Sequence, residues 1–557
     1  VYEKLKSIKS SRHRCPAPIR EKSATGSNNC VVTGSKSATG MPILLGDPQM
    51  HTRIPAVFHE VVLRGGDFKC RGTCFPGFPG LIVGFAEDFA WAVTGLGGER
   101  TDIYEEKLNP DNPEEYLYKE SWEPVTKRTE TIKVKDGDDI TFEVRSTHHG
   151  PICGELFGFD DKTIALKTVA FQVDDTISLS FLRVNLAKDY DTFREAVRNF
   201  EGYTGNMIYG DKEGRIAYWP AGKYPIRKSG MFWGPVPGWT GEYEWSGYVP
   251  FEELPTLDNP DQDFIATANN QIVCEWYPYQ IVQRPGAGTR FLRLCENILD
   301  HDKIDMDIMQ NEIRADITCT PDIRAVAPLL KGIVAAREGA SPEVIEAAER
   351  LAGWDGRFTP DTIAGTIFDK FVDGLGEAVC KPHLGDDYKM GIGSLIIVDL
   401  ASDSRWFNDP ATPEVETRDD VFYKLLCKTI ETLTAELGSN QDEWLWGKVS
   451  RIPVQDFMKE LGIDDKLKAP DLGLSYMGGR YALCPQVMKV MSYSQIVDVT
   501  DPDKTRAVLA VGVSELFDSP HCHDQFDMWR EFGLRPAHIS EDKLIAVSES
   551  EVVLKKG

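Results

Sequence analysis

The chain has 557 residues, of which 41% are hydrophobic and 10% aromatic, a composition typical of folded rather than disordered proteins. Its 62 basic and 87 acidic residues give a net charge of −25, which argues against nucleic acid or an anionic membrane surface as a partner. No run of about 18 apolar residues occurs, so the sequence predicts no membrane-spanning helix.

The chain begins at Val1, and no apolar signal segment follows. We therefore expect a fragment or a processed product of a longer protein. The 12 cysteines are scattered, without a CxxC pair and without a spacing typical of a zinc site. Ordinary buried thiols are the favoured interpretation, ahead of a disulfide framework.

Along the chain, a basic and polar stretch without apolar periodicity covers residues 1–26. Short β-branched and aromatic runs then predict strands at 30–32, 43–45, 61–63, 81–85 and 90–93, and hairpins between 129 and 170. Helical periodicity begins near residue 186 and dominates from about 285 to 440, with the clearest helices at 322–337, 342–353 and 363–378. A strand pattern returns at 507–511. This order indicates an α+β fold.

Several common catalytic motifs are absent, including GxSxG, HExxH and the phosphate-binding loops. An amide hydrolase can work without them if its nucleophile is a chain-terminal serine, whose α-amine has a pKa near ~7.7–8 and can act as the base. Such a serine must be freed by cleavage of the backbone. The segment Thr25-Gly26-Ser27, followed at once by a strand, fits this requirement, although by itself it also fits an ordinary turn.

Eight sequence blocks give this segment its context. They lie at 26–29, 40–49, 78–84, 90–95, 147–152, 237–247, 266–270 and 519–521. In this order they resemble the penicillin acylase family of N-terminal-nucleophile hydrolases, over nearly the whole chain from Gly26 to about residue 537. The resemblance implies a four-layer αββα sandwich with a largely helical insertion at about 285–440. It also implies that 1–26 is the end of a spacer and that 27–557 is the catalytic β-subunit.

The resemblance further implies a role for each matching residue. The hydroxyl of Ser27 attacks the amide carbonyl, and its own α-amine is the base. The backbone N–H of Gly95 and the side-chain amide of Asn269 hold the oxyanion. Gln49 and Arg290 belong to the network around the amine.

Three of these assignments have alternatives that stay open at this stage. The neighbouring Asn270 is a second candidate for the oxyanion donor. Gln49 also fits a turn after Asp47-Pro48, and Arg290 also fits a surface ion pair.

Met50 and Val83 align with positions that shape the acyl pocket in the family, although ordinary core packing explains them equally well. The resemblance implies no organic cofactor. Many relatives bind one structural calcium, for which Glu99 and Asp102 would supply oxygen ligands. The family has a further aspartate among its ligands, and residues 276–281 contain no match for it. Whether this chain binds calcium therefore stays open.

Histidines at two places raise the question of a transition metal. His149 and the pair His521 and His523 have no further ligands at a suitable spacing in the sequence. Structural hydrogen bonding is therefore the favoured interpretation of all three.

The implied function is a self-processing amide hydrolase acting through an acyl-Ser27 intermediate. Its substrate would be a β-lactam side-chain amide, an N-acyl-homoserine lactone or a similar N-acyl amide. We expect an α-subunit from the same precursor as partner, a periplasmic or extracellular location, and no activity while the Gly26–Ser27 bond is intact. The alternative is a non-catalytic, unprocessed family member acting as a binding module, but such a module has no need for Ser27, Gly95, Asn269 and Arg290 together.

Overall fold

A computed structural model describes residues 26–50, 52–159, 161–174, 176–230, 234–274, 276–282, 288–385, 397–398, 400–450, 455–456, 477–479, 482–484, 490–516 and 518–553. The predicted spacer remnant at residues 1–25 lies outside the described residues. All structural statements below concern this part of the chain.

Two seven-stranded antiparallel sheets form the centre of the molecule. The first has the order β21-β1-β2-β24-β25-β26, and β23 also pairs with β2. The bounds are β1 (Gly26–Val32), β2 (Ile43–Met50), β21 (Phe264–Thr267), β23 (Val490–Met491), β24 (Tyr493–Asp498), β25 (Arg506–Leu509) and β26 (Arg535–Pro536).

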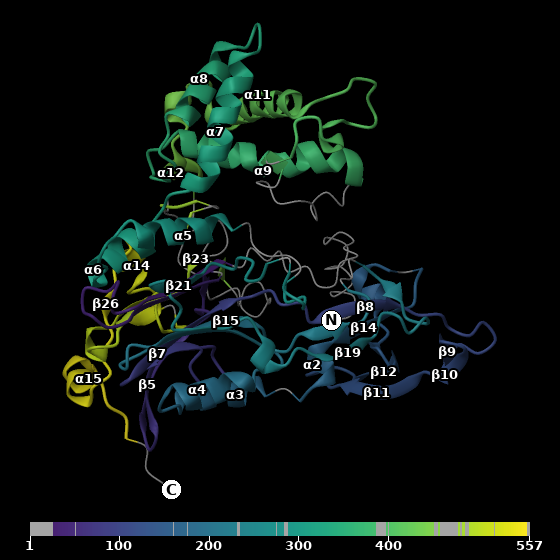
Figure 1. The fold of residues 1–557 in the computed structure, drawn as a ribbon, viewed down its shortest axis with the longest axis vertical. Helices are drawn as coiled ribbons and strands as arrows, with labels where there is room; N and C mark the ends of the chain where they lie inside the picture. The colour runs from purple at the N-terminus through teal and green to yellow at the C-terminus, as the bar shows by residue number, and fades with distance from the viewer. Residues whose placement is uncertain are drawn as a thin grey trace.

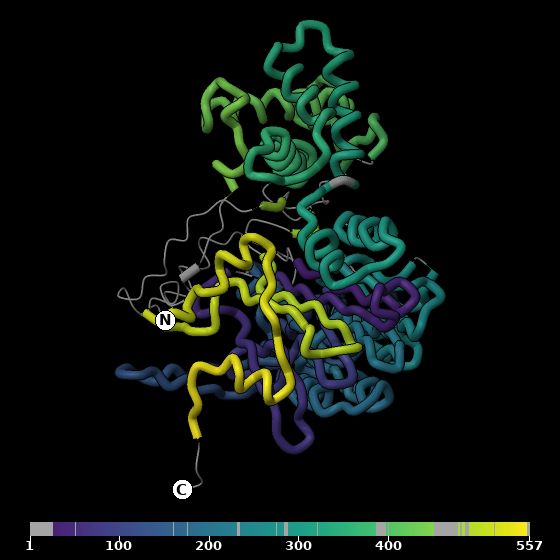
Figure 2. Tube along the Cα trace, turned by 90° about the vertical axis from the view of Figure 1, so that its left-hand side faces the viewer, coloured from purple at the N-terminus to yellow at the C-terminus, as the bar shows by residue number. Residues whose placement is uncertain are grey.

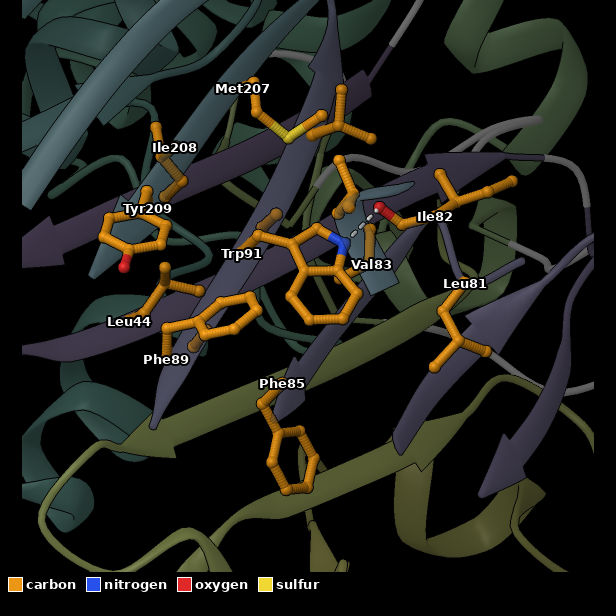
Figure 3. Packing of buried hydrophobic residues seen from close by; sticks show 14 of the residues in the cluster. Leu44, Leu81, Ile82, Val83, Phe85, Phe89, Trp91, Met207, Ile208 and Tyr209 are labelled. Carbon is orange, nitrogen blue, oxygen red and sulfur yellow. Dashed lines mark hydrogen bonds between the residues drawn. The ribbon is translucent and has the colours of Figure 1, made fainter. Parts of the chain in front are cut away.

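The second sheet has the order β20-β16-β15-β7-β6-β5-β4. Its strands are β4 (His59–Gly65), β5 (Phe68–Cys74), β6 (Val83–Ala86), β7 (Phe89–Gly95), β15 (Gly205–Asp211), β16 (Ile216–Ala221) and β20 (Leu257–Asp258). Val31 and Leu44 of the first sheet share one buried cluster with Trp91 and Ile208 of the second (Figure 3). The two sheets therefore pack face to face.

Helices cover the two outer faces of this pair of sheets. α3 (Ile177–Asn185) and α4 (Tyr190–Arg198) contribute Phe181 and Phe193 to the cluster of the second sheet. On the far side of the first sheet, Cys30 and Val32 pack with side chains of α5 (Thr289–Leu299). The layers run helix, sheet, sheet, helix, which confirms the predicted αββα fold class.

Strand β1 is buried along its whole length. Successive side chains of a strand point to opposite faces, so Val31 enters the core between the sheets while its neighbours face α5. The β-branched run that follows Ser27 is thus suited to a central strand that is covered on both sides.

A separate group of helices has its own hydrophobic cluster and lies at one end of the molecule (Figures 1 and 2). It consists of α7 (Thr320–Ala335), α8 (Pro342–Ala352), α9 (Ala364–Leu384), α11 (Arg418–Leu437) and α12 (Trp446–Val449). Helices α7, α8 and α9 correspond to the three predicted helices. Their ends agree within two residues, except that α9 continues to Leu384, beyond the predicted end at 378. Helix α5 lies within the predicted helical range but packs against the first sheet instead of joining this group.

Smaller sheets lie beside the second large sheet (Figure 1). They contain β8 (Thr101–Glu105), β14 (Ile164–Thr168) and β18 (Val236–Pro237); β9 (Glu115–Tyr118) and β10 (Ser121–Pro124); β11 (Thr126–Ile132), β12 (Ile140–Thr147) and β13 (Gly150–Pro151); and β17 (Pro225–Arg227) and β19 (Trp245–Tyr248). A further two-stranded sheet consists of β3 (Arg53–Ile54) and β22 (Gln455–Asp456), and Ile54 packs with Val490 and Met491 of the first large sheet. Short helices complete the described elements: α2 (Val169–Gln172), α6 (Met306–Ile308), α14 (Phe526–Arg530) and α15 (Glu541–Val547).

No disulfide bond joins the cysteines of the described residues. Cys30, Cys70, Cys319, Cys380, Cys484 and Cys522 are buried, as the composition predicted. In the described part of the chain, no helix combines the length and apolar character needed to cross a membrane.

Candidate active site

Ser27 is the second residue of β1, and only 7% of it is exposed. Its hydroxyl donates a hydrogen bond to the carbonyl oxygen of Gly26 and accepts one from the backbone N–H of Gln49 at 3.3 Å. The pairing of β1 with β2, in which Gly26 lies opposite Gln49, holds this arrangement. The candidate nucleophile thus lies against the carbonyl of the bond that the sequence predicts to be cut.

Gln49 is buried within β2 and is not a turn residue. Its amide nitrogen donates to Asp47 Oδ2 at 3.0 Å and to the carbonyl oxygen of Leu483 at 2.9 Å. Its amide oxygen has no hydrogen-bond partner among the described residues. A Cβ atom added to Gly26 would lie 2.3 Å from this oxygen, so the end of the Gln49 side chain would have to shift to admit it.

Asp47 is a site residue that the sequence analysis did not single out. Its carboxylate also accepts hydrogen bonds from Asn28 Nδ2 at 3.4 Å and from the hydroxyl of Ser494. Burial raises the pKa of Asp47, against the opposing effects of the Arg314 charge and these hydrogen bonds. The only sequence signal was its place in the family-like block at 40–49.

The Arg290 guanidinium joins β1 to the loop that follows β21. One nitrogen donates to the Ser27 carbonyl oxygen at 3.1 Å and to Asn28 Oδ1 at 2.9 Å. The other donates to the Ala268 carbonyl oxygen at 2.9 Å and to Asn269 Oδ1 at 2.8 Å. Burial lowers the pKa of Arg290 to about 10, so it remains charged at neutral pH.

Asn269 Nδ2 donates to the carbonyl oxygen of Gly95 at 2.6 Å. Its backbone has a positive φ of 60°, a conformation that asparagine adopts more readily than most residues. Asn270 is engaged locally, because its side-chain oxygen accepts the backbone N–H of Ala268 at 3.0 Å. Asn269, and not its neighbour, therefore lies beside Gly95 at the end of β7 in the second sheet.

The two candidate pocket residues occupy different surroundings. Met50 is half-buried at the end of β2, where its backbone N–H donates to Ser492 Oγ at 2.7 Å. Val83 is fully buried among the residues between the two large sheets (Figure 3). Core packing thus accounts for Val83, and its contribution to an acyl pocket remains a prediction.

The two candidate calcium ligands lie near a guanidinium group. Asp102 Oδ2 accepts hydrogen bonds from Arg227 Nε at 2.8 Å and from the indole N–H of Trp245 at 2.6 Å. Arg227 Nη2 also reaches the carbonyl oxygen of Glu99 at 3.2 Å. The Asp102 carboxylate, with a side chain 5% exposed, is already neutralised by this cation. In this arrangement the residues do not fit a calcium ion. Calcium binding by this chain stays a prediction that metal analysis would test.

Comparison with known proteins places these findings in a family context. The sequence model of penicillin amidase matches residues 3–546. An acyl-homoserine lactone acylase QuiP of Pseudomonas aeruginosa is 26% identical over an alignment of 490 positions that covers 82% of this chain and 57% of that protein. The penicillin G acylase of Escherichia coli is 23% identical over an alignment of 586 positions, gaps included, that covers 95% of this chain and 66% of that protein.

The fold also has a match among solved structures. A thermostable penicillin G acylase from Alcaligenes faecalis superposes with a TM-score of 0.78 at 20% identity, covering 95% of this chain and 100% of that one. The chain spans little more than half the length of the acyl-homoserine lactone acylases that it matches, 57% in the Pseudomonas aeruginosa protein.

Proposed function

Because the chain belongs to the penicillin amidase family, we propose that it is the catalytic part of a self-processing enzyme that hydrolyses N-acyl amide bonds through an acyl ester on Ser27. The observation that carries this proposal is the contact between the Ser27 hydroxyl and the Gly26 carbonyl oxygen. This contact brings the Ser27 hydroxyl next to the peptide bond whose cleavage would free the Ser27 amine.

The processing step begins with attack of Ser27 Oγ on the carbonyl carbon of Gly26. A Gly26–Ser27 ester forms, the C–N bond breaks, and the hydroxyl proton passes to the nitrogen that becomes the α-amine. Water then hydrolyses the ester and leaves Ser27 as a chain terminus. The hydroxyl is regenerated, and a base that did not exist before now stands beside it.

Catalysis would use the same atoms again. The α-amine of Ser27 takes the hydroxyl proton while Oγ attacks the substrate carbonyl, and the amine of the substrate leaves with that proton. The unpartnered amide oxygen of Gln49, next to the position of Gly26, would accept a hydrogen bond from this α-amine. The charge of Arg290, which contacts the Ser27 carbonyl oxygen, favours the unprotonated amine.

The oxyanion would be stabilised by the backbone N–H of Gly95 and the side-chain amide of Asn269. That amide carries two N–H groups, and the Gly95 carbonyl engages one of them. Each such donor typically contributes about 3–4 kcal/mol to lowering the barrier. The second N–H of Asn269 is therefore assigned to the substrate.

The substrate class follows from the relatives. Their names include acyl-homoserine lactone acylase, penicillin acylase and penicillin G acylase, and each name denotes an enzyme that removes an acyl group. We assign this chain an N-acyl amide of that kind, together with an α-subunit from the same precursor as its partner. An N-acyl-homoserine lactone and a β-lactam side-chain amide are the first two substrates to test.

Replacement of the nucleophile tests the proposal. We expect Ser27→Ala, expressed from the complete gene, to keep the Gly26–Ser27 bond and to hydrolyse no N-acyl amide in a substrate panel. The matched control Ser35→Ala lies in the turn after β1 and should be processed and active. An intact-mass spectrum that shows an active wild-type enzyme with an uncut bond contradicts the mechanism. Unchanged ligand binding in Ser27→Ala without any wild-type hydrolysis would indicate the binding-module alternative.

A further inference from the structure

A second group of chemically reactive side chains lies in the small sheets, outside the residues assigned to the amidase site. His148 and His149 form the turn between β12 and β13, and Glu244 directly precedes β19. Each of the three side chains offers one possible ligand atom, and these atoms all lie within 4.8 Å of one another. His149 Nε2 is 2.9 Å and His148 Nε2 is 3.3 Å from Glu244 Oε1.

The other ring nitrogens are held by acceptors from neighbouring strands. His149 Nδ1 lies 2.8 Å from Glu106 Oε1, and His148 Nδ1 lies 3.0 Å from the hydroxyl of Tyr116. Glu106 is fixed in turn by the hydroxyl of Thr147 at 2.7 Å. An Nδ1–H that donates to an oxygen leaves the Nε2 lone pair free for a metal, and carboxylates of this kind commonly orient metal-bound histidines.

We propose that His148 Nε2, His149 Nε2 and Glu244 Oε1 form a binding site for a divalent transition metal of the zinc type. Tetrahedral zinc binds nitrogen and oxygen at about 2.0–2.2 Å, which sets neighbouring ligand atoms about 3.3 Å apart. The two shortest separations here are close to that value. Binding displaces the proton between His149 and Glu244, which is released to solvent.

The burial of the group is suited to such a site. His149 is fully buried, Glu244 is 13% exposed at its side chain, and His148 is 32% exposed. The ring of His149 also stacks on Tyr104, with 3.7 Å between ring centroids. Two largely buried ligands and one partly exposed ligand would leave a fourth coordination position to water.

One neighbouring charge opposes the metal. Lys167 Nζ lies 3.2 Å from Glu244 Oε2, the oxygen that faces away from the rings in the contacts described above. The second carboxylate of the group, Glu106, compensates for this positive charge. Removal of the Lys167 charge should therefore tighten metal binding, an effect in the opposite direction to that of removing a ligand.

The site would link segments that are far apart in the chain. The turn of His148 and His149 and the segment before β19 are 95 residues apart, and Glu106 follows β8. A bound ion would stabilise the folded state by mass action. The proposal is independent of Ser27 and of the amidase activity.

Metal titration of the full chain tests this site. Wild-type protein should bind one equivalent of Co²⁺ with the visible absorption of tetrahedral coordination, and Zn²⁺ should displace it and raise the Tm. We expect His148→Ala and Glu244→Gln to weaken binding by about a hundredfold or more. The second-sphere variant Glu106→Gln should weaken it by about 10–100-fold.

Two further variants make the outcome decisive. His301→Ala removes a histidine from elsewhere in the molecule, next to Glu312, and should bind cobalt like the wild type. Lys167→Met should bind more tightly, which a purely structural hydrogen-bond network does not predict. The proposal is overturned if wild-type protein binds no equivalent of cobalt or zinc, or if folded His148→Ala binds as tightly as His301→Ala.

Discussion

The amide oxygen of Gln49 lies 2.3 Å from the point where a Cβ of residue 26 would stand. Gly26→Ala therefore requires the amide of Gln49 to shift, which strains its hydrogen bonds to Asp47 and Leu483. We expect cleavage at the Gly26–Ser27 bond to be strongly slowed, together with a stability loss of about 1–3 kcal/mol from overpacking. Intact-mass analysis over time and denaturant unfolding measure the two effects.

Gly234→Ala is the matched control, because a Cβ at that glycine meets nothing within 4 Å. It should be processed at the wild-type rate. Normal processing of Gly26→Ala would show that Gln49 moves freely and that its place beside residue 26 is unimportant.

Variants of two neighbouring asparagines can show which of them is the oxyanion donor. We expect Asn269→Ala to lower kcat by about 10²–10³ with a small change in KM, because only the transition state carries the full negative charge. Asn270→Ala breaks a local hydrogen bond to Ala268 and should have a much smaller effect on kcat. Steady-state kinetics of both processed variants decide between them, and the reverse ranking would reassign the role to Asn270.

A buried carboxyl group in α7 should make stability depend on pH. Burial raises the pKa of Asp322 from its usual 3.8 to about 8. The folded state then keeps a proton that the unfolded state loses, so this contribution to stability is complete below pH 3.8 and disappears as the pH rises to about 8. Asp322→Asn should abolish this loss, which is roughly 5 kcal/mol at most.

The free energy of unfolding at pH 5 and pH 8 measures this effect. Relative to wild type, Asp322→Asn should gain more stability at pH 8 than at pH 5. The exposed Asp302→Asn serves as control and should shift both values equally. An equal shift in Asp322→Asn would mean that its carboxyl group is ionised in the folded protein.

The pairing of Asp102 with Arg227 gives a prediction about calcium. Because a guanidinium already neutralises this carboxylate, adding calcium to metal-free wild-type protein should leave its Tm unchanged. Arg227→Met should cost about 3–5 kcal/mol, since it leaves a buried charge without its partner. Added calcium should raise the Tm of that variant more than that of wild type. A clear rise in the Tm of metal-free wild type on addition of calcium would establish the calcium ion instead.

The residue patterns predicted the α+β order, whereas the four-layer arrangement followed only from the family resemblance. Local signals located β1, β2 and β7, and the apolar periodicity placed both ends of α7 and α8 within two residues, but the central strands β15, β16 and β24 were not predicted. The position of α5 was less accessible to prediction. Its apolar face could pack against the first sheet or against the group of helices α7 to α12. Only the three-dimensional arrangement shows that it packs against Cys30 and Val32 of β1.

The candidate site shows the same division between local and distant information. Ser27 and Gln49 could be located because they lie in short recognisable blocks. The carbonyl oxygen of Leu483 carries no sequence signal, although it accepts hydrogen bonds from both Asn28 and Gln49. Likewise His149 gave no metal prediction, because its partner Glu244 follows 95 residues later. Contacts across such separations depend on the register of strands that a single sequence does not fix.

The position of Ser27 in a strand with paired neighbours has a consequence for the timing of the chemistry. A newly made chain end is usually the most mobile part of a protein. Here the bond to be cut is the first one of β1, whose next residues are paired with β2 and, from Asn29 onward, with β21 as well. The liberated amine would therefore already be held in place when it forms. The conformational entropy of positioning it is lost once, during folding, and not again in each turnover.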